Sequence, residues 1–435
     1  MAKPTVTEKE TNALIKPYNW YWHPYKTWLD MFLGLIFWFV FPLQKMAKLP
    51  ATKSNAETKK QNDDLRSLKR KGSAVYGKKA LVKWEVTAKC AIVQHTYSVA
   101  RKPLLKEWGL YEESLEEKSP AGDIEVVISF PSSIMEQAKD ANPLEKNEFG
   151  CAAAEKLDLE NLPLEVPVVL HFFGGGMTIG DCSDVSGLQL AQQVCELASK
   201  SIIIAGVYYS QSPEQPFPVA VEETLTVVSY FLDKLPDRAI HLSGISAGAN
   251  LAAVATMEMH RKYPGRISTS SIFCPMLNPA ANTLSYYLNS KSFYISTEWL
   301  RWCWRAYLEL PDAQKQGDIT MQQLETMEAR LDLGSNRSAW EDPPFNKGVL
   351  ARLVNPTVDM PDGGLNKPNA PKFLVMTNEG DPLRDDGAEL AEKLKSAGAD
   401  LRYLEHPGSH WMGTALDKKH YASLVSNLRE ILFSK

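Results

Sequence analysis

The sequence is poor in the residues and patterns that mark several protein classes. Its six cysteines are scattered and form no CxxC pair, which argues against a disulfide scaffold and a zinc site. Acidic residues slightly outnumber basic ones, giving a net charge of −4 in 435 residues. Because nucleic-acid-binding proteins usually present a strongly basic face, no nucleic-acid partner is expected. The hydrophobic and charged fractions, 44% and 23%, are ordinary for a globular protein.

A hydrophobic run near the N-terminus is too short for an ordinary membrane span. Residues 31–43, MFLGLIFWFVFPL, are thirteen residues without a charge, and a helix of this length covers about 20 Å of the ~30 Å hydrocarbon core. Tyrosine and tryptophan gather just before the run, and residues 45–71 carry nine basic against three acidic residues. A secretory signal peptide would instead have its basic region before the run and a small-residue cleavage site after it.

We therefore expect residues 27–43 to associate with a membrane surface, as a monotopic anchor or a strained span. The alternative is a helix that packs on the body of the protein as part of a lid. If the run spans the bilayer, the basic flank favours a cytosolic body, with the endoplasmic reticulum and the lipid droplet as candidate membranes. The predicted organisation is a membrane-associating segment at 1–50, a polar linker at 51–79 and a folded domain at 80–435.

Beyond residue 80, stretches typical of strands alternate with stretches typical of helices. This order predicts an α/β fold with a mostly parallel central sheet and helices on both faces. The nearly continuous apolar character of the strands agrees with burial on both faces. The predicted strands are 80–86, 122–131, 165–173, 201–209, 239–244, 268–277, 371–380 and 401–408, and the predicted helices are 188–200, 219–235, 247–263, 387–398 and 418–433.

The alternation stops between about 277 and 368. The early part of this insertion, SFYISTEWLRWCWRAYLEL at 292–310, is rich in tryptophan and tyrosine. A long segment of this kind between two sheet strands is either a cap over a site or a disordered excursion. The aromatic content favours a folded cap with an apolar lining.

One short motif has the local context that catalysis requires. Gly244-Ile245-Ser246-Ala247-Gly248 is a G-x-S-x-G sequence between a predicted strand and a predicted helix, as in a nucleophile elbow. Side chains at 244 and 248 would collide with neighbouring backbone in so tight a turn. A helix N-cap serine would fit the same place and is the alternative interpretation of Ser246.

Three consecutive glycines, Gly174, Gly175 and Gly176, follow the predicted strand at 165–173. A flexible loop is the simple explanation, but acyl transfer offers a specific one. Its carbonyl oxygen gains negative charge, and one fixed backbone N–H stabilises that charge by about 3 kcal/mol. We expect Gly175 and Gly176 to donate to this oxygen together with the N–H of Ala247, and Gly174 to bend the loop.

A serine nucleophile needs a base and an orienting acid, which in this architecture follow it in the order acid, then histidine. Asp381 follows the predicted strand at 371–380, and His410 follows the one at 401–408. The predicted triad is therefore Ser246, Asp381 and His410. Asp381 could instead be a helix N-cap and His410 a surface histidine. His406 competes as the base, and the acids that compete with Asp381 are Glu379, Asp385 and Asp386.

These motifs together resemble the hormone-sensitive-lipase family of α/β hydrolases, which includes arylacetamide deacetylase and related esterases. The resemblance covers roughly 160–430 and rests on HFFGGG, YYSQSPEQPFPVAVEE, GISAGANLA, DPLRDDG and the late His410. It implies the α/β-hydrolase fold, a helical cap formed by the N-terminal region and the insertion, activity on carboxylic esters, and no cofactor or metal.

Three positions depart from the family pattern. The family's His-Gly-Gly-Gly is Phe173-Gly-Gly-Gly here, with a histidine two places earlier at His171. The acid usual before the nucleophile is Ile245, and the glycine usual at 249 is Ala249. None of the three removes a nucleophile, base or acid. The absence of the first histidine affects which contacts hold the glycine loop at 174–176 in place.

The sequence therefore predicts a serine carboxylic-ester hydrolase that acts through an acyl-enzyme. The hydrophobic N-terminus and the tryptophan-rich insertion favour an apolar or lipid-like ester as its small-molecule partner. One alternative is an acyltransferase, which forms the same acyl-enzyme and passes the acyl group to an alcohol. The other is a non-catalytic receptor; the gibberellin receptors resemble this family but lack the catalytic histidine, which this chain retains as His410.

Overall fold

A computed structural model describes residues 92–111, 122–131, 152–153, 158–160, 162–180, 201–292, 295–308, 348–360, 364–415 and 417–433. The predicted membrane-associating segment, the linker, the strand at 80–86 and the helix at 188–200 lie outside these residues. Within them, no helix is both long enough and apolar enough to cross a bilayer.

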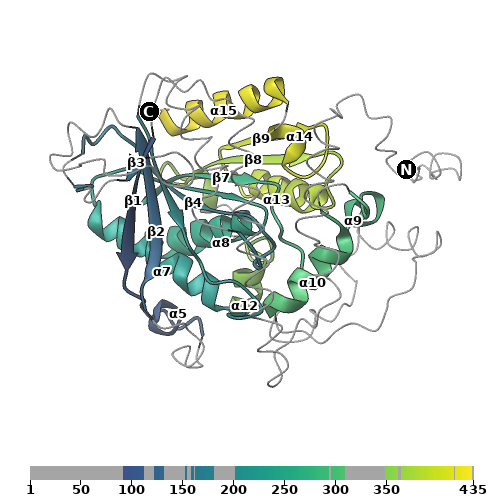
Figure 1. The fold of residues 1–435 in the computed structure, drawn as a ribbon, viewed down its shortest axis with the longest axis horizontal. Helices are drawn as coiled ribbons and strands as arrows, with labels where there is room; N and C mark the ends of the chain where they lie inside the picture. The colour runs from purple at the N-terminus through teal and green to yellow at the C-terminus, as the bar shows by residue number, and fades with distance from the viewer. Residues whose placement is uncertain are drawn as a thin grey trace, which may run out of the picture.

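The described strands form one nine-stranded sheet in the order β3-β1-β2-β5-β4-β6-β7-β8-β9 (Figure 1). All neighbours from β5 to β9 are parallel, whereas β2 is antiparallel to both β1 and β5. The predicted mostly parallel sheet is thus confirmed. The strands are β1 Ile92–Val99, β2 Ile124–Pro131, β3 Ala152–Ala153, β4 Val168–Phe172, β5 Ile203–Val207, β6 Ile240–Ile245, β7 Ile267–Phe273, β8 Lys372–Asn378 and β9 Leu401–His406.

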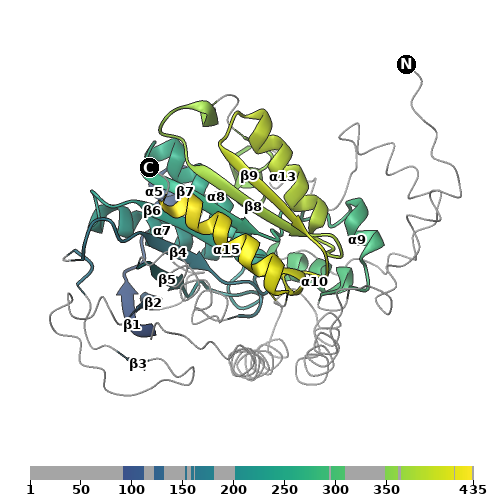
Figure 2. The ribbon, with the colours of Figure 1, turned by 90° about the horizontal axis from the view of Figure 1, so that it is seen from above.

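Helices cover both faces of this sheet, as predicted. The long helix α15 lies on one face, and α7, α8 and α13 lie on the other (Figures 1 and 2). The described helices are α5 Leu104–Glu107, α7 Val219–Lys234, α8 Ala247–Lys262, α9 Leu284–Leu288, α10 Thr297–Leu308, α12 Gly348–Val354, α13 Arg384–Ser396, α14 Met412–Ala415 and α15 Lys418–Phe433, with a 3-10 turn, η4, at Gly364–Asn366.

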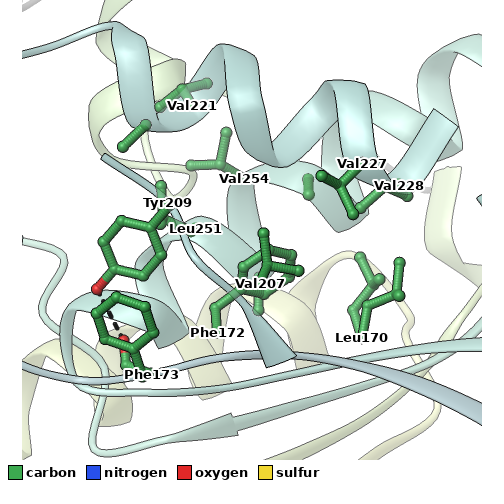
Figure 3. Packing of buried hydrophobic residues seen from close by; sticks show 14 of the residues in the cluster. Leu170, Phe172, Phe173, Val207, Tyr209, Val221, Val227, Val228, Leu251 and Val254 are labelled. Atoms are coloured by element: carbon green, nitrogen blue, oxygen red, sulfur yellow. Dashed lines mark hydrogen bonds between the residues drawn. The ribbon is translucent and has the colours of Figure 1, made fainter. Parts of the chain in front are cut away.

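Successive side chains of a strand point to opposite faces of the sheet, so one strand contributes to the apolar clusters on both faces. In β8, Leu374 and Met376 join the cluster under α15, whereas Phe373 and Val375 join the cluster under α8 and α13. A third cluster packs β4 and β5 against α7 and α8; Leu170 is one of its members (Figure 3). Each fully buried side chain of this kind contributes roughly 1.5–3 kcal/mol, so burial on both faces stabilises the parallel strands.

Two described strands, β1 and β3, were not predicted from the sequence. β1 pairs antiparallel with β2 along its whole length, and β3 pairs with β1. In β1 the exposed Thr96 and Ser98 precede the buried Val99. This weak polar alternation lacks the apolar run by which the central strands were recognised.

The insertion at 277–368 is described in part. Its aromatic segment forms α10, in which Trp299, Trp302, Trp304 and Tyr307 are buried. Cys303 of the same helix packs against Gly176: a side chain added at that glycine would meet the Cys303 Sγ at 2.4 Å. Helix α10 therefore lies against the glycine loop that follows β4. Residues 309–347 lie outside the description, and the role of the whole insertion as a cap stays a prediction.

Candidate active site

Ser246 occupies the turn between β6 and α8 in a conformation that few side-chain-bearing residues adopt. Its φ is +58° and its ψ is −119°. Its N–H donates to the carbonyl of Phe273 at 2.8 Å, and its own carbonyl accepts from Met276 N–H at 3.1 Å. Such backbone costs of order 1–3 kcal/mol and clusters at functional sites. The Ser246 side chain makes no capping hydrogen bond to α8, so the alternative of an ordinary N-cap serine is wrong.

The glycines on either side of Ser246 are required by close backbone contact, as predicted. A Cβ at Gly244 would lie 2.2 Å from the carbonyl oxygen of Gly248. A Cβ at Gly248 would lie 2.1 Å from the carbonyl oxygen of Phe172. Neither neighbour is a flexible side chain that could move aside. The turn is therefore tight enough to exclude any residue but glycine at both positions.

His410 and Asp381 form a buried pair. The two groups are joined by a hydrogen bond of 2.7 Å between His410 Nδ1 and Asp381 Oδ2, and both residues are buried. The second carboxylate oxygen, Oδ1, accepts from the N–H of Leu383 at 2.9 Å. The N-cap of α13 is Leu383 rather than Asp381, so Asp381 holds the turn before the helix and orients the histidine, and His410 is not a surface histidine.

The competing acids have other partners. Asp386 Oδ2 accepts from the N–H groups of Leu277 and Asn278, both at 2.9 Å. Asp385 accepts from Ser285 N–H at 2.7 Å, and the side chain of Glu379 is exposed. These contacts fix the loop after β7 and the start of α13, and they leave Asp381 as the acid on His410.

The competing base, His406, contacts Thr414 and His420. Its Nδ1 lies 3.0 Å from Thr414 Oγ1, and its ring stacks on His420 with centroids 5.0 Å apart. Burial and the neighbouring His420 lower its pKa to about 4. A histidine held in this way serves the structure of the loop after β9, because its polar contact is to Thr414 and it stays neutral.

The topology brings the predicted residues to one edge of the sheet. Ser246, Asp381 and His410 follow β6, β8 and β9, which run parallel. Ile245 and Trp411, the immediate neighbours of the serine and the histidine, belong to one apolar cluster. Phe273, the residue bonded to Ser246 N–H, stacks on Trp411 at 5.9 Å between ring centroids. All three residues thus lie at the carboxyl edge of the sheet. Ile245, at the position where the family has an acid, packs in the apolar cluster instead.

The glycine loop lies directly against Ser246. A Cβ at Gly174 would be 3.3 Å from the Ser246 Cβ. Positive φ angles occur at Gly175, Gly176 and Met177, +128°, +63° and +61°, so the bend predicted at Gly174 begins one residue later. Within the described part of the chain, the N–H groups of Gly175, Gly176 and Ala247 donate to no protein atom. Their role as oxyanion donors stays a prediction.

An aromatic residue holds this loop where the family has histidine. Phe173 is buried and stacks on Tyr209, with ring centroids 4.2 Å apart. Tyr209 also donates from its hydroxyl to the Phe173 carbonyl at 2.8 Å (Figure 3). Meanwhile His171 lies buried in β4 with its Nδ1 3.3 Å from Ser243 Oγ. The Tyr209 contact thus fixes the loop through its backbone.

One residue that the sequence analysis did not single out lies beside Asp381 and His410. Cys274, Asp381 and His410 each place a potential ligand atom within 4.8 Å of the others, and all three are buried. The 2.7 Å separation of the imidazole and carboxylate atoms is that of a hydrogen bond. Two ligands of a tetrahedral zinc with bonds of ~2.0–2.2 Å lie farther apart. The His410 and Asp381 atoms are therefore spaced as a hydrogen-bonded pair rather than as two ligands of one zinc ion.

Comparison with known proteins identifies the family of the chain. The family model described as "alpha/beta hydrolase fold" matches residues 169–411. The chain belongs to the hormone-sensitive-lipase family of α/β hydrolases. This α/β hydrolase is 25% identical over 248 residues to carboxylesterase NlhH of Mycobacterium tuberculosis, covering 56% of this chain and 65% of that protein. It is 24% identical to arylacetamide deacetylase of Oryctolagus cuniculus, covering 54% and 65%.

Solved structures share the fold of this hydrolase. An esterase of Pyrobaculum calidifontis superposes with a TM-score of 0.55 at 17% identity, covering 85% of this chain and 92% of that one. A thermostable carboxylesterase cloned from a metagenomic library gives a TM-score of 0.55 at 19% identity, covering 85% and 97%. The chain spans 60% to 65% of the length of the first curated relatives it matches.

Proposed function

We propose that this α/β hydrolase is a serine carboxylic-ester hydrolase with Ser246 as nucleophile, His410 as base and Asp381 as orienting acid. The observation that carries the proposal is the buried His410–Asp381 hydrogen bond of 2.7 Å on loops beside the strained Ser246 turn. The relatives named carboxylesterase and arylacetamide deacetylase support the same reaction class.

In the proposed reaction, Ser246 Oγ attacks the ester carbonyl while His410 Nε2 accepts the hydroxyl proton. Asp381 accepts from the opposite ring nitrogen, Nδ1, which keeps Nε2 available as the acceptor and stabilises the imidazolium. His410 then returns the proton to the alcohol oxygen as the ester C–O bond breaks. Water repeats the attack on the acyl-enzyme, with His410 again as base, and releases the carboxylic acid.

The charge that develops on the carbonyl oxygen is assigned to the N–H groups of Gly175, Gly176 and Ala247. All three lack a described protein acceptor, and Gly174 places the loop against Ser246. Helix α8 adds the positive end of its dipole at Ala247. Each fixed donor of this kind contributes about 3 kcal/mol to the transition state.

An apolar or lipid-like ester is the proposed substrate class. Buried aromatic residues of α10 pack beside Gly176, where Trp299 would lie 3.0 Å from an added Cβ. One relative, 23% identical, is named neutral cholesterol ester hydrolase 1 in Mus musculus. Both observations support a hydrophobic ester as the substrate.

A series of p-nitrophenyl esters from acetate to palmitate tests the reaction and the substrate class together. We expect turnover by the full chain, higher kcat/KM for longer acyl chains, and loss of turnover in Ser246→Ala. A preference for acetate would instead assign a deacetylase. Absence of turnover in the unmodified chain would contradict the proposal, and ester products formed with an added alcohol would assign acyl transfer.

Membrane association through residues 27–43 is proposed from the residue pattern alone. Cosedimentation of the full chain with phospholipid vesicles tests it against a variant carrying Leu35→Glu and Phe39→Glu within the apolar run. Two charges in the apolar run should abolish cosedimentation while ester hydrolysis in solution is retained. Equal cosedimentation of both proteins would contradict the proposal and favour the lid interpretation of this segment.

A further inference from the structure

The Cys274 thiol lies beside the His410–Asp381 pair. Its sulfur is within 4.8 Å of the Asp381 and His410 ligand atoms, and its side chain has no exposed surface. The residue follows β7 directly and has a φ of +45°, which is rare for a residue with a side chain. Its N–H donates to Met376 of β8 at 2.7 Å. The strained backbone at Cys274 thus places a small side chain where β7 and β8 end.

The polar groups nearest the sulfur come from Asn378, Asp381 and His410. The thiol donates to Asn378 Oδ1 at 3.2 Å. Cys274 packs in the same apolar cluster as Trp411, the residue after His410, and its sulfur lies within 4.8 Å of the Asp381 carboxylate. Burial, and then the nearby Asp381 charge, raise the pKa of this thiol well above its ordinary value. The sulfur is therefore present as a neutral S–H.

Asn378 extends the contact to the rest of the histidine loop. Its Nδ2 donates to Thr414 Oγ1 at 3.0 Å, and to the carbonyls of His406 and Pro407 at 3.4 Å. Its amide protons are thus directed to the loop, and its oxygen accepts from the Cys274 thiol. Trp411 itself has a φ of +52°, so the loop needs fixed partners to keep this conformation.

We propose that Cys274 is a positioning residue for catalysis: its thiol holds the His410–Trp411 turn and the Asp381 carboxylate in register with each other. The inference rests on the proposed serine hydrolase function. The thiol packs in one cluster with Trp411 and donates to Asn378, and it lies beside the carboxylate without competing strongly for it, because S–H is a weak donor. Loss of the thiol should leave the three triad residues present but misaligned.

The test uses a fluorophosphonate probe, which reacts with an activated serine, on the full chain. Two quantities are measured: the second-order rate constant of labelling and the fraction of chains labelled at completion. In Cys274→Ala we expect a rate constant lower by about 10-fold or more, since a displacement of ~1 Å costs on the order of 100-fold. The labelled fraction should match that of the unmodified chain, because Ser246 is still there.

Two further variants separate positioning from packing. Cys274→Ser keeps a small group that donates and accepts, and we expect it to restore the rate constant to within about threefold. Ser271→Ala removes one heavy atom from β7, three residues earlier, where the buried hydroxyl has no described partner, and it should leave the rate constant unchanged. With an ester substrate, Cys274→Ala should lower kcat and leave KM within about twofold.

The rate constant does not depend on how many chains are folded, so a partly unfolded preparation does not obscure the result. Labelling of Cys274→Ala at the unmodified rate would overturn the proposal, as would a Cys274→Ser variant as slow as Cys274→Ala. Failure of the unmodified chain to react at all would instead overturn the proposed function.

Discussion

Tyr209 supports the loop after β4 through the carbonyl group of Phe173. The hydroxyl donates at 2.8 Å and the two rings stack. These residues are 36 positions apart in the sequence, and they come from the two family motifs HFFGGG and YYSQSPEQPFP. Because the next residues are the proposed oxyanion donors, the position of this carbonyl sets the position of the donors.

Removal of the Tyr209 hydroxyl should therefore reduce both stability and turnover. Tyr209→Phe leaves a buried carbonyl without its partner, which costs about 1–3 kcal/mol, and lets the loop shift. We expect a lower denaturant midpoint and a kcat reduced several-fold for p-nitrophenyl esters. Tyr307→Phe is the matched control, since its buried hydroxyl has no described partner. Equal effects of the two variants would contradict the supporting role of Tyr209.

Gly248→Ala should damage the nucleophile turn. The added Cβ would lie 2.1 Å and 2.3 Å from the carbonyl oxygens of Phe172 and Phe173, and backbone cannot move aside cheaply. Overpacking of this kind costs roughly 1–3 kcal/mol or more, and the shift should abolish labelling of Ser246 by a fluorophosphonate. Gly109→Ala is the control: its φ is also positive but nothing lies within 4 Å, so labelling should persist. Normal labelling of Gly248→Ala would contradict the tight turn.

Asp381→Asn should impair catalysis far more than the same change at a neighbouring acid. The amide would favour the wrong tautomer of His410, and such a change costs about 10⁴-fold in the chymotrypsin-type triad. Asp385→Asn should change kcat less than about threefold, because Asp385 accepts from Ser285 N–H rather than from the histidine. Steady-state kinetics of the two variants measure kcat. A similar loss of kcat in both would mean that Asp381 is not the orienting acid.

Glu222 predicts a pH dependence of stability. Burial raises its pKa from an ordinary 4.5 to about 7, so the folded state binds a proton that the unfolded state releases. Stability is therefore highest below the ordinary pKa and falls as pH rises from about 4.5 to 7, by up to ~3 kcal/mol. Glu222→Gln still offers an oxygen to Leu105 N–H, the partner of Glu222 Oε1 at 3.2 Å.

Urea unfolding at pH 5 and pH 8 measures this effect. The loss of stability between the two pH values should be smaller in Glu222→Gln than in the unmodified chain, and the variant should be the more stable of the two at pH 8. An identical pH dependence in both proteins would show that Glu222 ionises freely in the folded state.

Much of the fold could be predicted from local patterns. The final helix was expected at 418–433 and is found at Lys418–Phe433, because its apolar residues recur with helical spacing. The parallel strands are buried on both faces and so appear as apolar runs. β1 was missed because it alternates polar and apolar residues, and its pairing with β2 depends on residues about 30 positions away.

The candidate site also contains residues that local sequence predicts and residues that it does not. Ser246, Asp381 and His410 could be named because each follows a strand in a fixed order. The support of Phe173 by Tyr209 and the place of Cys274 could not, because both depend on contacts between distant residues. A cysteine among six carries no local signal; only the packed ends of β7 and β8 bring its sulfur to Asp381.

Mass spectrometry of the chain after reaction with a fluorophosphonate tests the central claim most directly. We predict a single phosphonylated residue, Ser246, in the unmodified chain, with labelling at least about 100-fold slower in His410→Ala because that variant lacks the proposed general base. A label on a different residue, or labelling of Ser246 at the same rate without His410, would contradict the triad.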